Sequence, residues 1–140
     1  MQHIEVTQHL AVSPAAAWPI FMDLAGWTTW AGVGRVRVER EGDANGVGAI
    51  RVFSGGSARE EILSVGPGHR VTYTVLSGAP LRDHLGEAVF TEAADGGTDA
   101  IWRCRFESKI PGFGPVIRGG IGWVFRRTLR RLERETKRRG

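Results

Sequence analysis

Four side chains in the central part of the sequence have the chemistry to hold or act on a small molecule: Glu60, Tyr73, Arg82 and His84. His84 is the candidate acid/base, because an unperturbed imidazole pKa of about 6.5 suits proton transfer at neutral pH. Arg82 could anchor an oxygen of a ligand, and the Tyr73 hydroxyl could hydrogen-bond to one. Three of them also have a structural interpretation, with His84 and Tyr73 as hydrogen-bonded interior residues and Arg82 as a solvated charge at a rim.

Other kinds of site find little support in the sequence. Cys104 is the single cysteine, which excludes an internal disulfide, and it is expected to be a small buried hydrophobe. His3, His9 and His69 do not follow a metal-ligand spacing, so no metal site is expected. The glycines within 119–122 are not followed by Lys-Ser/Thr, and no Gly-x-Ser-x-Gly motif occurs, so no cofactor is predicted.

The strands that must position these side chains are predicted from periodicity and turn residues. Apolar and polar residues alternate in seven short segments, as in half-buried strands. Turn sequences such as Ser-Gly-Gly-Ser at 54–57 separate the later segments, and these short connections indicate antiparallel hairpins. The predicted strands are 3–12, 35–40, 49–53, 59–65, 70–76, 83–91 and 100–107.

Helices are predicted between the first and second of these strands and after the last one. Ser13-Pro14 has the residues of an N-cap and a first turn, so a short helix should start there, with another helical turn at 25–30. From Phe113 onward, apolar residues follow the i, i+3, i+4 spacing of one long amphipathic helix. Its glycines within 119–122 each cost about 1 kcal/mol relative to alanine, which indicates either a kink or a close approach to the sheet.

This order of elements predicts an α+β fold of the helix-grip kind, with a seven-stranded curved antiparallel sheet around the C-terminal helix and a single domain spanning 1–140. A sheet with one apolar face needs cover, and only the last helix is long enough to supply it. Because that helix fills the concavity only in part, we expect a cavity between sheet and helix, the usual setting for a small-ligand site.

Strand alternation assigns the side chains that face this cavity, provided that no bulge shifts the register. Strand 49–53 is ambiguous, because Arg51 and Phe53 oppose Ile50 and Val52. On the other strands the predicted lining residues are Glu60, Ile62, Tyr73, Val75, Arg82, His84, Phe90, Trp102 and Phe106. A mostly apolar lining with a few polar groups suits a hydrophobic ligand that carries one or two oxygens.

Several stretches of the sequence resemble a known family. Val12-Ser-Pro-Ala-Ala-Ala-Trp-Pro-Ile-Phe resembles the opening of the START-related, birch-pollen-allergen-like superfamily. Gly78-Ala-Pro-Leu-Arg-Asp-His-Leu-Gly-Glu is similar to a motif of its bacterial polyketide cyclase/dehydrase-like branch. Asp95-Gly-Gly-Thr, Trp102-Arg-Cys-Arg-Phe and Ile110-Pro-Gly-Phe-Gly-Pro extend the similarity over essentially the whole chain.

The resemblance implies the helix-grip fold and a range of activities, since ligand carriers, cyclases and hydrolases all occur in the superfamily. It also implies that Arg51, and with it Phe53, faces the cavity. Arg51 would then either contact the ligand or neutralise Glu60 on the next strand, because a buried charge needs a partner.

Three functions are compatible with these residues. The first is binding of a small lipid-like, polyketide or aromatic molecule. The second is cyclase or dehydratase chemistry, with His84 moving protons and Arg51 or Arg82 stabilising an enolate oxygen. The third is an interaction module whose basic segment 126–139, with eight basic and two acidic residues, docks on an anionic partner or membrane.

The surroundings of His84 should distinguish the first two functions. A hydrogen bond from His84 to Glu60 or Arg51 inside a closed pocket would favour the enzyme. A backbone partner for His84 in a pocket that is open along the helix would favour the carrier.

The composition and the N-terminal residues indicate where the protein is expected to be located. The 140 residues are 41% hydrophobic and 24% charged with a net charge of +4, as in an ordinary soluble protein. The basic segment lacks interleaved aromatic residues, so nucleic-acid binding is not expected. No apolar run reaches the roughly 18 residues of a membrane span, and the N-terminus lacks a signal-peptide pattern. A cytoplasmic location without stable membrane insertion is therefore expected, and a homodimer is left open.

Overall fold

The computed structural model describes residues 1–53 and 58–139, and this part of the chain forms the predicted strands and helices. The elements are β1 Gln2–Leu10, α1 Pro14–Met22, α2 Trp27–Trp30, β2 Val36–Arg40, β3 Ile50–Phe53, β4 Arg59–Val65, β5 His69–Ser77, β6 Leu81–Glu92, β7 Thr98–Ser108 and α3 Gly114–Arg139. The predicted turn at 54–57 lies outside the described residues.

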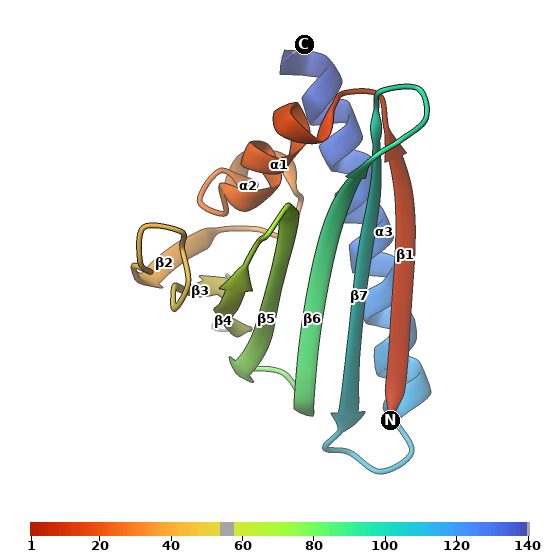
Figure 1. Ribbon diagram of the computed structural model, residues 1–140. Helices are drawn as coiled ribbons and strands as arrows, with labels where there is room; N and C mark the ends of the chain where they lie inside the picture. Colours follow the sequence, from red (N-terminus) through yellow and green to blue (C-terminus); the bar gives the residue numbers. More distant parts are fainter. Residues whose placement is uncertain (54–57, 140) are drawn as a thin grey trace.

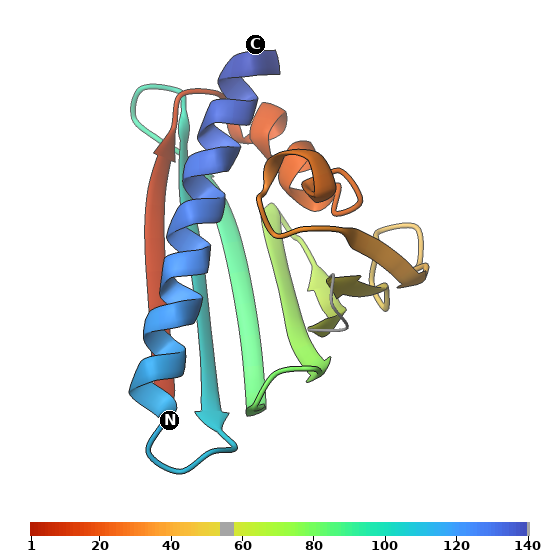
Figure 2. The same cartoon turned by 180° about the vertical axis from the view of Figure 1, so that it is seen from behind.

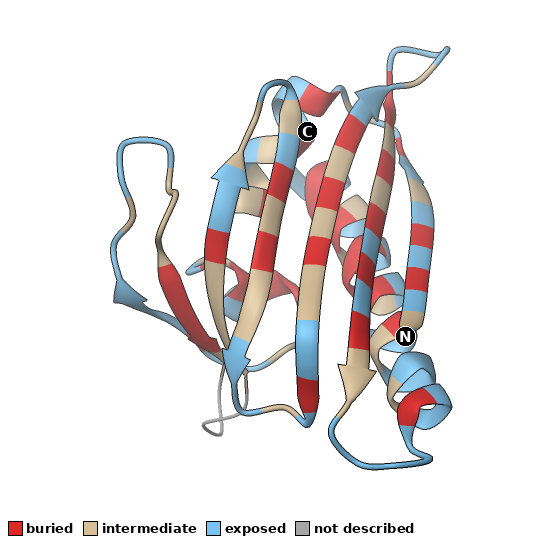
Figure 3. Cartoon of the chain, turned by 60° about the horizontal axis from the view of Figure 1, so that its bottom comes forward, coloured by how far each residue is buried: buried red, intermediate tan, exposed pale blue. Residues whose placement is uncertain are grey.

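The strands form one antiparallel sheet in the order β1-β7-β6-β5-β4-β3-β2 (Figure 1). From β2 to β7 each strand pairs with its neighbour in the chain, and β1 joins the sheet beside β7. Buried and exposed residues alternate along β7, as the coloured bands of Figure 3 show. The predicted α+β helix-grip fold is confirmed.

The two short helices after β1 pack aromatic side chains on the concave face of the sheet. α1 begins after Ser13, whose Oγ accepts a hydrogen bond from the backbone N–H of Ala16 at 3.3 Å and so acts as the N-cap. The Phe21 ring of α1 lies 5.0 Å from the ring of Phe90 and 5.4 Å from that of Trp102. These contacts bury the inner faces of β6 and β7 near the end of the sheet that α1 occupies.

The long helix α3 lies along β1 and β7 at one side of the sheet (Figures 1 and 2). Leu129 and Leu132 on its inner side are fully buried in the core. Because α3 packs at this side, the inner faces of β3, β4 and β5 are left to line a space beside the helix.

The glycines of α3 have different surroundings. A Cβ at Gly122 would lie 3.8 Å from Cγ2 of Ile4 on β1, so the helix approaches the sheet closely there. A Cβ at Gly119 or Gly120 would meet no atom within 4 Å. Of the two explanations that the sequence left open, close approach therefore applies to Gly122, whereas Gly120 leaves room beside the helix.

Candidate ligand-binding cavity

A cavity in two adjoining compartments lies between α3 and the inner face of the sheet. The α2 compartment has a volume of about 360 Å³ and is lined by Trp27, Ala31, Gly32, Val33, Phe53, Trp102, Arg127 and Thr128. The hairpin compartment has a volume of about 350 Å³ and is lined by Val75, Ala79, Pro80, Leu81, His84, Ile117, Gly120 and Ile121. Both are also lined by Ala58, Glu60, Tyr73, Val124 and Phe125.

A cluster of packed aromatic rings forms the wall at the centre of the cavity. Trp102 stacks on Phe125 of α3 at 3.9 Å between ring centroids, and its Nε1 donates a hydrogen bond to the Tyr73 hydroxyl at 2.8 Å. Tyr73 lies flat against the neighbouring strand, where a Cβ at Gly86 would come within 2.6 Å of its Cε1. Glycine at 86 is thus needed for this ring position, and burial holds the pKa of Tyr73 well above its usual value.

Arg51 and Glu60 form a buried ion pair next to this cluster. Nε and Nη2 of Arg51 both lie 3.3 Å from Oε1 of Glu60, and Arg51 is only 6% exposed. The guanidinium lies 5.5 Å from the centre of the Tyr73 ring, so Arg51 is on the inner face, where the resemblance placed it. Burial raises the pKa of Glu60, while Arg51 acts in the opposite direction. Arg51 thus neutralises Glu60 and lines neither compartment.

His84 lines the hairpin compartment and is held by the backbone of the adjacent strand. Its Nδ1 accepts a hydrogen bond from the Val75 N–H at 3.2 Å, and its carbonyl oxygen accepts one from the Thr74 hydroxyl at 2.7 Å. Because Nδ1 accepts, the neutral ring carries its proton on Nε2. Burial lowers the pKa of His84 to about 4, so the ring is uncharged at neutral pH. In the described residues, His84 makes no hydrogen bond to Glu60 or Arg51.

We expect His84 to weaken the fold as the solution is acidified. Its folded pKa of about 4 lies below its ordinary value of 6.5, so the unfolded chain binds the proton more readily. Stability is therefore lost as pH falls from 6.5 towards 4, by on the order of 3 kcal/mol from this group. Denaturant unfolding at several pH values should show a smaller acid loss for His84→Leu than for the native chain. An NMR titration midpoint of His84 near 6.5 would contradict this.

Arg82 does not face the cavity, which corrects the placement predicted from strict alternation. Arg82 pairs with Glu107 of β7 and Leu85 pairs with Arg105, so β6 carries one extra residue between these pairs. Asp83 accommodates this bulge with a φ of 52°. The shift turns Arg82 outward, where its Nε lies 3.5 Å from Glu107 and its side chain is 61% exposed.

Three other predicted lining residues lie in the packed core. Ile62 and Phe90 are 4% and 3% exposed, and Phe106 is fully buried, and none of the three lines a compartment. Phe90 is covered by α1, whose Trp18 ring lies 5.0 Å from it. Alternation identified the inner face correctly at these positions, but the helices cover that part of the face. The predicted residues that do line the cavity are Phe53, Glu60, Tyr73, Val75, His84 and Trp102.

Sequence patterns did not predict the residues of the helices, and of the loop after α2, that line the cavity. The i, i+3, i+4 spacing of apolar residues in α3 could have identified Ile121 and Phe125. The apolar face that a helix turns toward the sheet also faces any cavity between the helix and the sheet. Arg127, Thr128 and Gly32 carried no such signal. Their position depends on where the loop after α2 meets α3.

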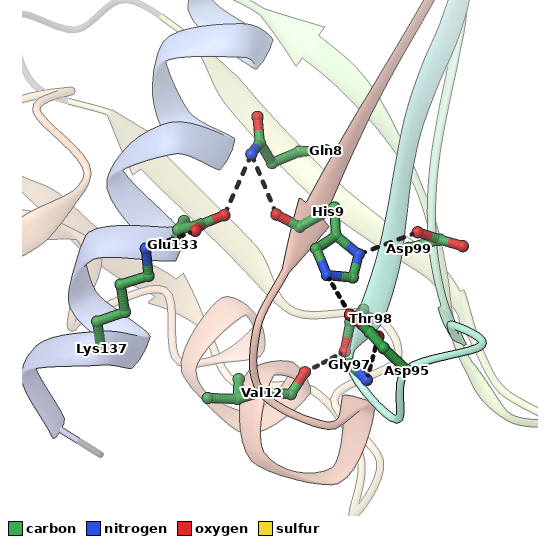
Figure 4. Close-up of polar contacts among 9 residues, drawn as sticks. All are labelled: Gln8, His9, Val12, Asp95, Gly97, Thr98, Asp99, Glu133 and Lys137. Atoms are coloured by element: carbon green, nitrogen blue, oxygen red, sulfur yellow. Dashed lines mark hydrogen bonds and ion pairs between the residues drawn. The ribbon is translucent and has the colours of Figure 1, made fainter.

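Polar contacts near the C-terminal end of α3 are structural (Figure 4). Nε2 of Gln8 on β1 donates a hydrogen bond to Glu133 at 3.2 Å, and Lys137 pairs with the same carboxylate at 3.0 Å. His9 lies between the carboxylates of Asp95 and Asp99, at 3.0 and 3.4 Å. Within residues 1–53 and 58–139, no group of three or more His, Cys, Asp or Glu side chains is arranged so that it could hold a metal ion.

None of the helices in the described part of the chain is both long and apolar enough to span a membrane.

Comparison with known proteins gives a family match and several structural likenesses. The family model described as "Polyketide cyclase / dehydrase and lipid transport" matches residues 1–137. No curated protein matches the chain. A protein from Thermobifida fusca has a TM-score of 0.84 at 21% identity, covering 99% of this chain and 95% of its own. A START superfamily protein from Mycobacterium smegmatis has a TM-score of 0.82 at 12% identity, covering 99% of both chains. An aromatase/cyclase from a Streptomyces species has a TM-score of 0.80 at 15% identity, covering 99% of this chain and 94% of its own.

Proposed function

The chain belongs to the polyketide cyclase/dehydrase and lipid transport family, and we propose that it binds a small hydrophobic molecule between the sheet and α3. The observation that carries the proposal is the two-compartment cavity, whose volumes of about 360 and 350 Å³ are each large enough for a small ligand. Its walls are mostly aromatic and aliphatic, with Glu60 and His84 among the few polar side chains. Transfer of a hydrophobic molecule from water to such walls is favourable.

The surroundings of His84 support a carrier more than an enzyme. Its Nδ1 is occupied by the backbone of Val75, and the lowered pKa leaves it a weak base at neutral pH. The cavity also opens to solvent beside α3, since Val124 lines both compartments and is 38% exposed. Catalysis of reactions with charged intermediates usually requires a closed, water-excluding site.

A cyclase or dehydratase reaction is the second candidate, favoured by the position of His84 in the cavity wall. In this function the Nε2–H of neutral His84 would donate a hydrogen bond to a substrate oxygen and stabilise the negative charge that develops there. If a polyketide substrate is turned over, His84→Ala should reduce the rate, and an unchanged rate would remove His84 from any catalytic role.

The third candidate function, an interaction module, depends on the positive charge of segment 126–139, and part of this charge is neutralised by carboxylates of α3 itself. Lys137 pairs with Glu133, and Arg138 and Arg139 pair with Glu135. If the basic segment nevertheless docks on a partner, charge reversal at its exposed arginines should abolish that binding without altering the cavity.

Filling the hairpin compartment from α3 provides a direct test of ligand binding. We expect Gly120→Phe to weaken binding of any cavity ligand by at least about tenfold, because Gly120 lines the compartment and has open space at its Cβ position. Gly119→Phe is the matched control, since Gly119 is exposed, has equally open space and lines neither compartment. Native mass spectrometry and thermal shift against lipid and polyketide-like panels would measure both variants. The proposal fails if no molecule binds the native chain, or if both variants bind equally.

A further inference from the structure

Two arginine side chains of α3 converge on Gly32, a residue that lines the α2 compartment. Arg127 lines this compartment, and its Nη1 donates a hydrogen bond to the carbonyl oxygen of Gly32 at 3.2 Å. Arg131, one turn further along α3, does not line the compartment but also reaches Gly32, because a Cβ at Gly32 would lie 2.7 Å from its Nε. Gly32 has a φ of +73°, and its missing side chain leaves room for both guanidinium groups. The loop after α2 therefore brings two positive charges together at this edge of the cavity.

Neither guanidinium is neutralised by the part of the chain that the structure describes. Residues 1–53 and 58–139 place no carboxylate within ion-pair distance of Arg127 or Arg131, whereas Arg138 and Arg139 of the same helix share Glu135. Both arginines are only partly exposed, so water screens their mutual repulsion less than on an open surface. Arg127 is further held over the Trp123 ring at 5.2 Å. Two adjacent, oriented and uncompensated guanidinium groups form a favourable site for an anion.

A buried hydroxyl without a partner lies in the wall of the same compartment. Thr128 lines the α2 compartment and is only 1% exposed, yet its Oγ1 has no hydrogen-bond partner among the described residues. A buried hydroxyl without a partner is unfavourable, and such groups are usually satisfied by protein, water or ligand. In this structure Oγ1 is shielded from the cavity, so a ligand oxygen would reach it only after the Thr128 side chain turns.

We propose that the ligand is an anionic amphiphile, with its carboxylate or phosphate at Arg127 and Arg131 and its apolar part among Trp27, Phe53 and Trp102. This inference rests on the proposed function and assigns a chemical class to the ligand. The apolar part lies against the rings of the α2 compartment, where transfer from water is favourable. The anionic group stays at the mouth, where it keeps part of its hydration and avoids the cost of complete burial. Glu60 does not repel it strongly, because Arg51 already neutralises that carboxylate.

The experiment compares three probes that share one alkyl chain, namely decanoate, decyl phosphate and decanol, by calorimetry below their aggregation concentrations. The native chain is expected to bind at least one of the two anions at least about tenfold more tightly than decanol, the fold-change of a single charge-assisted hydrogen bond. Which anion binds more tightly distinguishes a carboxylate from a phosphate ligand. The double variant Arg127→Gln/Arg131→Gln should bind the anions no more tightly than decanol.

The matched control is Arg130→Gln/Arg134→Gln, which removes the same charge from exposed positions of α3 that line neither compartment. This control should keep the preference for anions, and equal losses in both double variants would overturn the assigned anion site. Equal binding of decanol and the anions to the native chain would also overturn it, while leaving the hydrophobic cavity as the ligand site. If none of the three probes binds, the anionic amphiphile is excluded, and the wider ligand panel then decides whether the cavity binds anything.

Discussion

Replacing Arg51 with methionine is expected to lower the free energy of unfolding by about 3–5 kcal/mol at neutral pH, because Glu60 loses its buried partner. Glu60 cannot turn easily to bulk water, since its side chain is only 15% exposed in the wall of the cavity. The methionine keeps most of the arginine volume, so the loss measures the uncompensated charge more than a void. Denaturant unfolding of both chains at pH 7 would give the difference.

The cost of Arg51→Met should shrink as the solution is acidified. Burial already raises the pKa of Glu60 above 4.5, and removing Arg51 removes a cause that lowers it. A carboxyl whose pKa is raised by folding is protonated more readily in the folded chain. Stability is thus greatest below the unfolded pKa and is lost as pH rises through the folded pKa. Unfolding measurements from pH 7 towards pH 4.5 should therefore show the variant approaching the native chain.

A double variant separates loss of the partner from loss of packing. Arg51→Met/Glu60→Leu replaces both charges with apolar groups and should recover most of the lost stability, since buried ion pairs are often replaceable in this way. If the double variant is as unstable as Arg51→Met, packing by the arginine stem rather than charge compensation holds this part of the sheet.

Truncation of Phe106 to alanine is expected to cost about 3–5 kcal/mol of stability while leaving ligand affinity nearly unchanged. Phe106 is fully buried on β7 and lines neither compartment, so its removal leaves a void in the packed core. Denaturant unfolding measures the stability loss. Titration of a ligand bound by the native chain, under conditions where the variant is folded, measures the affinity.

Phe53→Ala is the matched comparison, because Phe53 is also a phenylalanine on the inner face but is only partly buried and lines the α2 compartment. Its truncation enlarges an existing cavity and removes ligand contacts, so we expect a smaller stability loss and a larger affinity loss than for Phe106→Ala. The opposite order of either quantity would show that the boundary between core and cavity lies elsewhere.

The fold and part of the site could be predicted because they depend on local patterns. Alternation and turn residues specify each strand, and the i, i+3, i+4 spacing specifies α3, within a few neighbouring residues. The same alternation placed Tyr73 and Trp102 on one face, and in the structure they are joined by a hydrogen bond in the cavity wall. The helix-grip arrangement then follows from the need to cover a single apolar sheet face.

The departures from these predictions have non-local causes. A bulge at Asp83 turns Arg82 outward, and this is decided by how β6 pairs with β7 over several residues. The pKa of His84 falls to about 4 because the surrounding elements bury the ring, which no sequence pattern near His84 records. The chemistry first assigned to these two residues from their types alone is therefore changed by their surroundings.

The sequence by itself determined the strands, the long helix, the inner face and the family resemblance, because each depends on residue types at short fixed spacings. Only the tertiary structure decided which part of that inner face is core and which part is cavity. Phe90 and Phe53 follow the same alternation, but α1 covers Phe90 while Phe53 stays in the cavity wall. The approach of Arg127 and Arg131 to Gly32 likewise joins residues almost a hundred positions apart. Such placements depend on the packing of whole elements, and a local pattern contains no information about them.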